Sequence, residues 1–228
     1  MNDNNMRFMS VDENEPDRQR KRRNFTAPLG SATSGRLVFA SGVGGVTIQA
    51  DPTLPDLYRA TFEHHLPGVQ VQDGAVTIQY RRFLVSDRRE PIAQLTLNGA
   101  IPWEIEFRDG VSQLTADLSR LPLRALDLSS ASQVVITLPQ PSAAVFVHVS
   151  GSASDLTIYR PAGVAIRVHI SGSASNLALD EHHFGATADG LHWQTPDYHR
   201  TTQRYDLSVS GSVSNLTITS SKKKERTK

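Results

Sequence analysis

The sequence predicts an all-β protein, and within that class a single-stranded parallel β-solenoid (β-helix) with coils of about 20–22 residues. Apolar and polar residues alternate with a period of two through the middle of the chain, as in "WEIEF", "FVHVS" and "YDLSVS", which is the pattern of strands. No stretch of useful length carries the apolar stripe of a helix. One unit of strand, serine-glycine corner and strand is written three times, as "VHVSGSASDLTIYRP", "VHISGSASNLALDEH" and "LSVSGSVSNLTITSS", from Val147, Val168 and Leu207.

The repeat keeps its register over a longer part of the chain. Val111 to Ala131 is a step of 20 residues, Ala131 to Ala153 is 22 and Ala153 to Ala174 is 21. The step from Ala174 to Val213 is 39 residues, which corresponds to one repeat carrying an insertion. A unit of about 20 residues with two short strands cannot close a core of its own, so neighbouring units must stack.

Equivalent positions of the repeat share their chemistry. One column is apolar and another is rich in amides; their members are Leu114, Val134, Leu156, Leu177 and Leu216, and Gln113, Gln133, Asp155, Asn176 and Asn215. Parallel stacking would place equivalent residues above one another at roughly 4.8 Å. A corner that stacks on itself needs small side chains, and we expect Gly151, Gly172 and Gly211 to take positive φ angles there. Right-handed coiling is the expectation for parallel crossovers.

Alternation also assigns the two sides of each strand. The expected inward set is Val145, Val147, Val149, Ile166, Val168, Ile170, Tyr205, Leu207 and Val209. The expected outward residues form two stacks, Phe146, Arg167 and Asp206 beside His148, His169 and Ser208. An antiparallel sandwich of hairpins is the competing fold, to which the Asp73-Gly74 turn would contribute. A sandwich has no reason to keep equivalent residues at a fixed period.

Three parts of the chain differ in composition. Residues 1–34 are predicted to be a disordered N-terminal tail, because their polar sequence cannot bury enough apolar surface to offset chain entropy. Its basic run supplies candidate contacts to an anionic surface: Arg20, Lys21, Arg22 and Arg23. The solenoid is predicted to span residues 35–220, with an insertion loop at 180–204, and residues 221–228 form a basic C-terminal tail.

Charge and composition exclude several classes of function. The chain has 24 basic and 23 acidic residues, so it presents no global field for nucleic acid, and no nucleic-acid partner is expected. It has no cysteine, which excludes disulfides, thiolate metal sites and cysteine nucleophiles. No segment has the apolar length of a signal peptide or of a membrane helix, so we expect a cytoplasmic protein.

The recurring Gly/Ser-Ala-Ser corner, the apolar doublet after it and the "RPAGV" turn from Arg160 to Val164 together mark roughly residues 103–218. In these features the chain resembles the adhesin-like β-solenoid domains of unknown function found in bacteria. It is also similar to the C-terminal domain of the LiaF-type cell-wall-active-antibiotic response proteins. The resemblance implies a bacterial β-solenoid and carries no catalytic residues, since "adhesin" describes a shape in that family.

The search for chemistry leaves few candidates. "SGVGGV" from Ser41 lacks the lysine and the helix of a phosphate-binding loop, and serines repeated at stacked corners indicate structure, not a nucleophile. His148 and His169 are expected to stack on one outer face, but two ligands alone make a poor metal site, and no cofactor or metal is expected. The insertion supplies the candidate interaction surface, His182, His183, His192, Trp193, Tyr198 and His199. Its main expected role is to cover an open flank of the solenoid with Phe184 and Trp193.

These observations favour a non-enzymatic scaffold or interaction module with an unknown protein partner. Self-assembly is the first alternative, because a last coil ending near Ile218 without a cap would expose strand edges to another copy. This would resemble the bactofilins, held at the inner membrane face by the basic tails. A β-helix enzyme acting on polysaccharides is the second alternative, and it is disfavoured because the outward acids fall on different coils or columns. These acids are Glu104, Glu106, Asp127, Asp155 and Asp206.

Overall fold

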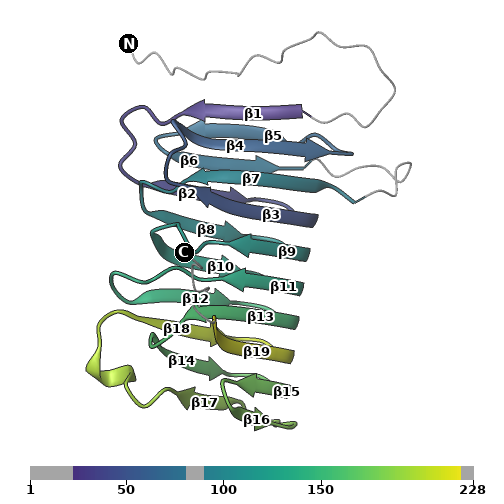
Figure 1. Ribbon diagram of the computed structural model, residues 1–228. Helices are drawn as coiled ribbons and strands as arrows, with labels where there is room; N and C mark the ends of the chain where they lie inside the picture. The colour runs from purple at the N-terminus through teal and green to yellow at the C-terminus, as the bar shows by residue number, and fades with distance from the viewer. Residues whose placement is uncertain (1–22, 81–89, 222–228) are drawn as a thin grey trace, which may run out of the picture.

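The computed structural model describes residues 23–80 and 90–221 and is all-β apart from a single 3-10 turn, as predicted (Figure 1). The strands form two mixed sheets. In spatial order, sheet A contains β1 (Arg23–Pro28), β4 (Asp56–Glu63), β7 (Ile92–Asn98), β3 (Val43–Asp51), β9 (Val111–Asp117), β11 (Ala131–Thr137), β13 (Ala153–Pro161), β19 (Val213–Ser221), β15 (Ala174–Leu179) and β16 (His182–Phe184). Sheet B contains β17 (Leu191–Gln194), β14 (Ala165–Ile170), β18 (Arg204–Val209), β12 (Val145–Val149), β10 (Leu123–Leu128), β8 (Trp103–Phe107), β2 (Gly35–Phe39), β6 (Ala75–Gln79) and β5 (Gly68–Gln72). The 3-10 turn η1 is Tyr198–Arg200.

The middle of both sheets is parallel and keeps the predicted register. We call a sheet B strand and the sheet A strand that follows it a coil. The apolar column pairs across five sheet A strands in the order Leu114, Val134, Leu156, Leu216 and Leu177. Both ends of the stack differ from an all-parallel arrangement, because β1, β4 and β5 at one end and β16 and β17 at the other pair antiparallel.

The spatial order of the coils departs from their order in the chain. The last coil, β18–β19, lies between β12–β13 and β14–β15, because β19 pairs with both β13 and β15 (Figure 1). The coil β2–β3 is inserted in the same way between β6–β7 and β8–β9. The expectation that the last coil ends the stack is therefore wrong. The short cap strands β16 and β17 occupy that end instead.

The residues predicted to face inward are all buried and belong to one continuous core. Aromatic side chains fill the core near β2 and β8, where the rings of Phe39 and Phe107 stack with centroids 4.7 Å apart. Trp103 is fully buried there, and its indole N–H donates to the backbone oxygen of Asn98 at 2.8 Å. Stacked coils thus bury what a single coil would leave exposed.

The serine-glycine corner is closely stacked, as its small side chains predict, but its glycines do not take positive φ angles. Positive φ angles fall on the amide column, at Asp155 (51°), Asn176 (53°) and Asn215 (54°), and not on the corner glycines. Gly211 is required by close packing instead, because a Cβ atom there would lie 2.3 Å from the backbone oxygen of Gly151. The amide column tolerates the left-handed conformation and links the coils: Asn176 donates to Asn215 at 2.7 Å, and Asn215 donates to Asp155 at 2.8 Å.

Parts of the predicted tails lie outside the described residues, including Arg20, Lys21, Arg22 and most of 221–228. Residues 23–28, which the sequence analysis places in the N-terminal tail, form strand β1, and Arg23 pairs there opposite Phe62. Within the described part of the chain, no helix has the length and apolar character needed to cross a membrane.

Candidate functional site

The insertion at 180–204 covers one end of the stack. Strand β16 pairs antiparallel with β15, and β17 pairs antiparallel with β14. Phe184, Leu191 and Trp193 are half-buried against the end of the core. This matches the predicted role of Phe184 and Trp193, since the apolar side chains of the insertion replace the next coil that the stack lacks.

Tyr198 in η1 anchors the insertion to sheet B. The guanidinium groups of Arg167 and Arg204 lie over its ring, at 4.8 and 4.5 Å from the ring centroid. Its hydroxyl donates to Asp206, whose carboxylate also pairs with Arg167 at 2.7 Å. Burial, and then the bond to Asp206, raise the pKa of Tyr198. Tyr198 is 1% exposed, so it fixes the insertion and is not part of the surface on which the sequence analysis placed it.

The predicted histidine surface divides into two sides. His182 lies near Trp193, with ring centroids 5.9 Å apart. On the outer face of sheet B, His192 stacks on His169 with centroids 3.9 Å apart. His183 in β16 and His199 in η1 are exposed, and His183 pairs opposite Ala178 at the edge of sheet A. The candidate residues therefore do not form a single surface.

His148 and His169 share a row but do not stack on each other. Ser208 of the inserted coil lies between them in the pairing register. Its hydroxyl is 2.7 Å from Nδ1 of His148. The two predicted outward stacks otherwise form as expected. The residue from β18 lies in the middle of each, Asp206 in one stack and Ser208 in the other. Among the described residues, no three histidine, aspartate or glutamate side chains converge as metal ligands would.

A hollow of about 510 Å³ lies where the insertion leaves and rejoins the coils. Its lining residues include Arg160, Asp180, Glu181, His182, Trp193 and Asp197. Arg160 is 6% exposed and donates to the Asp180 carboxylate at 2.5 Å and to the Val164 backbone oxygen at 2.6 Å. Sequence reasoning gave Arg160 no site role, although the structure places it at the end of β13 beside the hollow. Arg160 becomes part of the hollow because Asp180, at the start of the insertion, lies against it.

The acids on the outer face of sheet B are less scattered than the sequence analysis expected. Glu106 and Asp127 are paired neighbours in one row, and His148 is the next residue of that row. Hydrogen bonds from Arg108 and Arg36 lower the pKa of Glu106. Partial burial, and then repulsion from Glu106 and Glu104, raise the pKa of Asp127 against an opposing effect of His148. The pairing of parallel strands brings these acids together, although they are 21 residues apart in the sequence.

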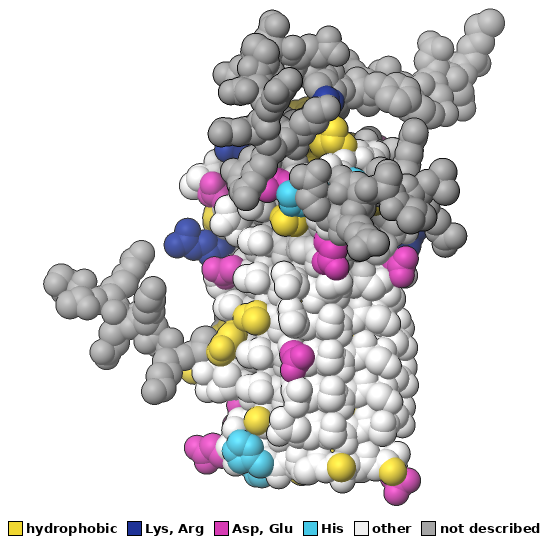
Figure 2. All heavy atoms as spheres, turned by 90° about the vertical axis from the view of Figure 1, so that its right-hand side faces the viewer, with side chains coloured by type: hydrophobic (Ala, Val, Ile, Leu, Met, Phe, Trp, Pro, Cys, Tyr) yellow, Lys and Arg dark blue, Asp and Glu magenta, His cyan; other side chains and the backbone are white. Residues whose placement is uncertain are grey.

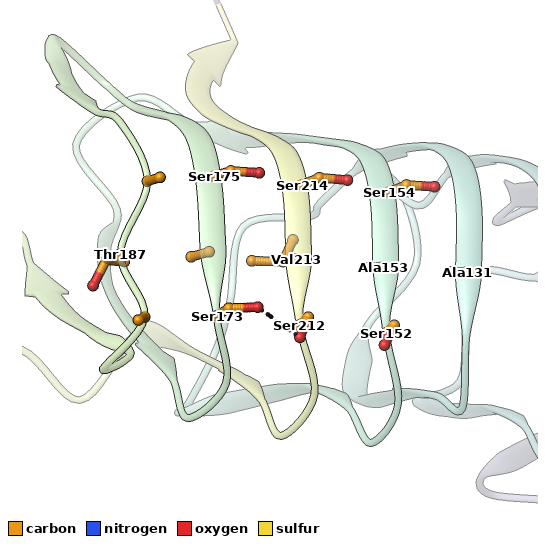
Figure 3. A pocket seen from close by; sticks show the side chains of 13 residues that line it. Ala131, Ser152, Ala153, Ser154, Ser173, Ser175, Thr187, Ser212, Val213 and Ser214 are labelled. Carbon is orange, nitrogen blue, oxygen red and sulfur yellow. Dashed lines mark hydrogen bonds between the residues drawn. The ribbon is translucent and has the colours of Figure 1, made fainter.

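The serine corners form a second, shallower hollow of about 690 Å³ (Figure 3). Ser175, Ser214 and Ser154 lie in one row across three strands, and Ser173 donates to Ser212 at 2.9 Å. The lining side chains are serine, threonine, alanine and valine, so none of them is a general base. Charged side chains are sparse along this face of the coils (Figure 2). The corner serines thus stack in rows at this face, as the repeat predicts.

Comparison with known proteins adds information on the fold. The sequence matches no protein-family model and no curated protein sequence. Among solved structures, a candidate cell adhesion protein from Clostridium sporogenes is similar, with 17% identity, a TM-score of 0.67, and coverage of 89% of this chain and 100% of that chain. A candidate adhesin from Bacteroides fragilis matches at 9% identity and a TM-score of 0.35, over 89% of this chain and 98% of that chain. At this level of identity, the likeness to the Clostridium sporogenes protein shows a shared fold and nothing further about function.

Proposed function

We propose that the chain is a non-enzymatic, adhesin-like β-solenoid module that binds a ligand or partner at its capped end. The observation that carries the proposal is the hollow beside the cap, where His182 and Trp193 of the insertion converge with the ion pair between the buried Arg160 and the half-buried Asp180. A rigid stack of coils supports these residues from behind. Binding sites are most precise when such supporting elements hold their side chains in place.

The lining chemistry indicates the kind of ligand. Trp193 is half-buried and offers an aromatic surface, and Glu181 and Asp197 are exposed carboxylates on the same hollow. Asp197 has only a long, exposed ion pair with Arg200 at 3.5 Å. A ligand with hydrogen-bond donors or a cationic group beside an apolar face would satisfy both features. Sugars and basic peptide segments have this combination.

The proposal is tested with the full chain and a panel of immobilised oligosaccharides and lysine- or arginine-containing peptides. We expect at least one class to bind, and Glu181→Gln to weaken that binding about tenfold, which is about 1.4 kcal/mol. Glu104→Gln removes the same charge from the outer face of sheet B and should leave binding unchanged. Failure of every probe to bind, or equal weakening by both variants, would contradict a site at the cap.

A polysaccharide-acting enzyme is a second candidate, and one specific observation favours it. Glu106 and Asp127 are neighbouring carboxylates whose pKa values shift in opposite directions, the arrangement used by acid and base pairs in glycoside hydrolysis. Asp127 is exposed to solvent on the outer face of sheet B, however, whereas catalytic carboxylates with shifted pKa values are usually shielded from water. Release of reducing ends from polysaccharides by the wild type, lost in both Glu106→Gln and Asp127→Asn, would establish this activity in place of simple binding.

Self-assembly of the chain was expected to use free strand edges on the last coil, and the described structure has no such free edges on β19. Both edges of β19 are paired, by β13 and by β15. The end strands of that flank are only three and four residues long, which is a usual way to blunt a sheet edge. An end-to-end filament of the bactofilin kind would therefore have to use the antiparallel caps.

A further inference from the structure

The coil β18–β19 is at once the last described element of the chain and an interior element of the stack. Strand β18 pairs in parallel with β12 and with β14, and β19 pairs in parallel with β13 and with β15. The coil thus fills a slot that has strand edges on both sides. Without it, those edges would present rows of unpaired backbone donors and acceptors, which are a template for another strand.

Side-chain contacts make this slot specific for its coil. Asn215 occupies the middle of the amide ladder between Asn176 and Asp155. Gly211 lies between the backbones of Gly151 and Gly172 at distances that leave no room for a Cβ atom. At the other end of the coil, the Tyr205 hydroxyl donates to the Pro139 backbone oxygen at 2.6 Å. An occupant must therefore match the repeat in sequence and in register.

The connection to the rest of the chain is short and local. Residues 201–203 link η1 to β18, and η1 is held by Tyr198 against Arg204 and Asp206 of the coil itself. The coil follows the cap in the chain, and residues 162–164 connect the two walls of the slot, from β13 to β14. The cap remains paired to β14 and β15 when it does.

We propose that the slot between β12–β13 and β14–β15 accepts the β18–β19 coil of a second copy of this chain, so that two copies exchange their last coils reciprocally. Every strand pairing lost from the closed monomer is regained in the exchanged dimer, because the incoming coil is identical. The balance between the two forms is then set by protein concentration and by the hinge at 201–203. This inference is independent of ligand binding at the cap.

Cysteine pairs report directly on which coil occupies the slot, since the chain has no cysteine of its own. Ser154 and Ser214 are paired neighbours, and Ser214 also pairs with Ser175. Neighbouring positions fall within the Cα separation a disulfide needs, whereas Ser154 and Ser175, two strands apart, exceed it at roughly 9.6 Å. The double variant Ser154→Cys/Ser214→Cys should therefore close an internal disulfide. That result also shows that the geometry and the oxidation conditions are suitable.

The exchange test mixes two full-length single variants, Ser154→Cys and Ser214→Cys, at high concentration before oxidation. We expect a disulfide-linked heterodimer whose yield rises with concentration and whose mass on size-exclusion chromatography is twice that of the chain. The matched control mixes Ser154→Cys with Ser175→Cys, whose positions both belong to the walls of the slot, and measures random collision. A yield no higher than this control, together with a complete internal disulfide in the double variant, would overturn the exchange.

A second pair of cysteine positions repeats the test in case substitution of Ser154 or Ser214 disturbs the structure locally. Thr157 and Thr217 pair three residues further along the same two strands, so Thr157→Cys and Thr217→Cys repeat the mixing experiment. If neither double variant forms a disulfide, either within one chain or between two, β19 does not lie beside β13 and the inference is refuted. A disulfide within a single Ser154→Cys/Ser175→Cys chain would equally refute it, because it would show the slot closed by direct pairing of its walls.

Discussion

Gly211 offers a stringent test of the inserted coil, because its packing depends on having a neighbour on each side. A Cβ atom added there would meet the backbone oxygen of Gly151 at 2.3 Å, and the Cβ of an alanine at position 172 would meet the oxygen of Gly211 at 2.4 Å. Ordinary contacts of a Cβ atom lie at 3.4–4 Å, so the backbones must separate by about 1 Å. The strands on either side are held by parallel ladders and cannot separate locally without strain.

We therefore expect Gly211→Ala to lower the free energy of unfolding by about 1–3 kcal/mol, the usual cost of overpacking. For a chain of this size that corresponds to a fall in Tm of roughly 2–12 °C. Urea unfolding followed by circular dichroism measures the change. Gly185→Ala is the matched control, because nothing lies within 4 Å of its added Cβ. Equal stability of the two variants would refute the close stacking of three corners and the insertion of the last coil on which it depends.

Three further changes test other parts of the structure. Leu216 is fully buried in the inserted coil, so Leu216→Ala should cost about 2–5 kcal/mol in urea unfolding, with a cost below about 1 kcal/mol speaking against a central position. Tyr198→Phe keeps the ring but removes the hydrogen bond to Asp206. We expect it to lower the free energy of unfolding by about 1–2 kcal/mol and to increase hydrogen exchange in residues 182–200. Unchanged hydrogen exchange would contradict the anchoring role of Tyr198. The pKa of Asp127 is raised, so its charged form is disfavoured in the folded state and stability should increase as pH falls through that pKa. Asp127→Asn should accordingly stabilise the protein slightly at pH 7. The lowered pKa of Glu106 means that its contribution to stability is present above its unfolded pKa near 4.5 and is lost as pH falls through its lower folded pKa. Thermal melts from pH 3 to 7 compare Asp127→Asn with the wild type, and an unchanged melting temperature at pH 7 would contradict the raised pKa of Asp127.

The strand pattern was predictable because alternation is a local property. Val147, Val168 and Leu207 face inward for the same reason, namely that a strand places every second side chain on one side. The register was also predictable, since columns such as Leu156, Leu177 and Leu216 repeat at a nearly fixed step. Identical columns, however, pair equally well in any order, so the repeat itself contains no information on which coil lies beside which.

The candidate site was only partly predictable. The insertion stood out as a break in the repeat, and its apolar residues indicated a cap. The roles of individual side chains were not visible, because they depend on partners distant in the sequence. Tyr198 looked available for binding, yet Arg167 and Asp206 bury it, and Arg160 became part of a site only through Asp180.

The sequence by itself determined the all-β class, the spacing of equivalent strand positions, the faces of the strands and the stacking of the corner serines, because each follows from local geometry and from the spacing of equivalent residues. The tertiary structure alone decided the order of the coils and the contacts of the cap. The return of β18–β19 into the stack brings Ser208 between His148 and His169 and pairs both edges of β19. The physical reason is that chemically equivalent coils have equivalent edges, so the choice among stacking orders depends on how the insertion and the chain connections fit together.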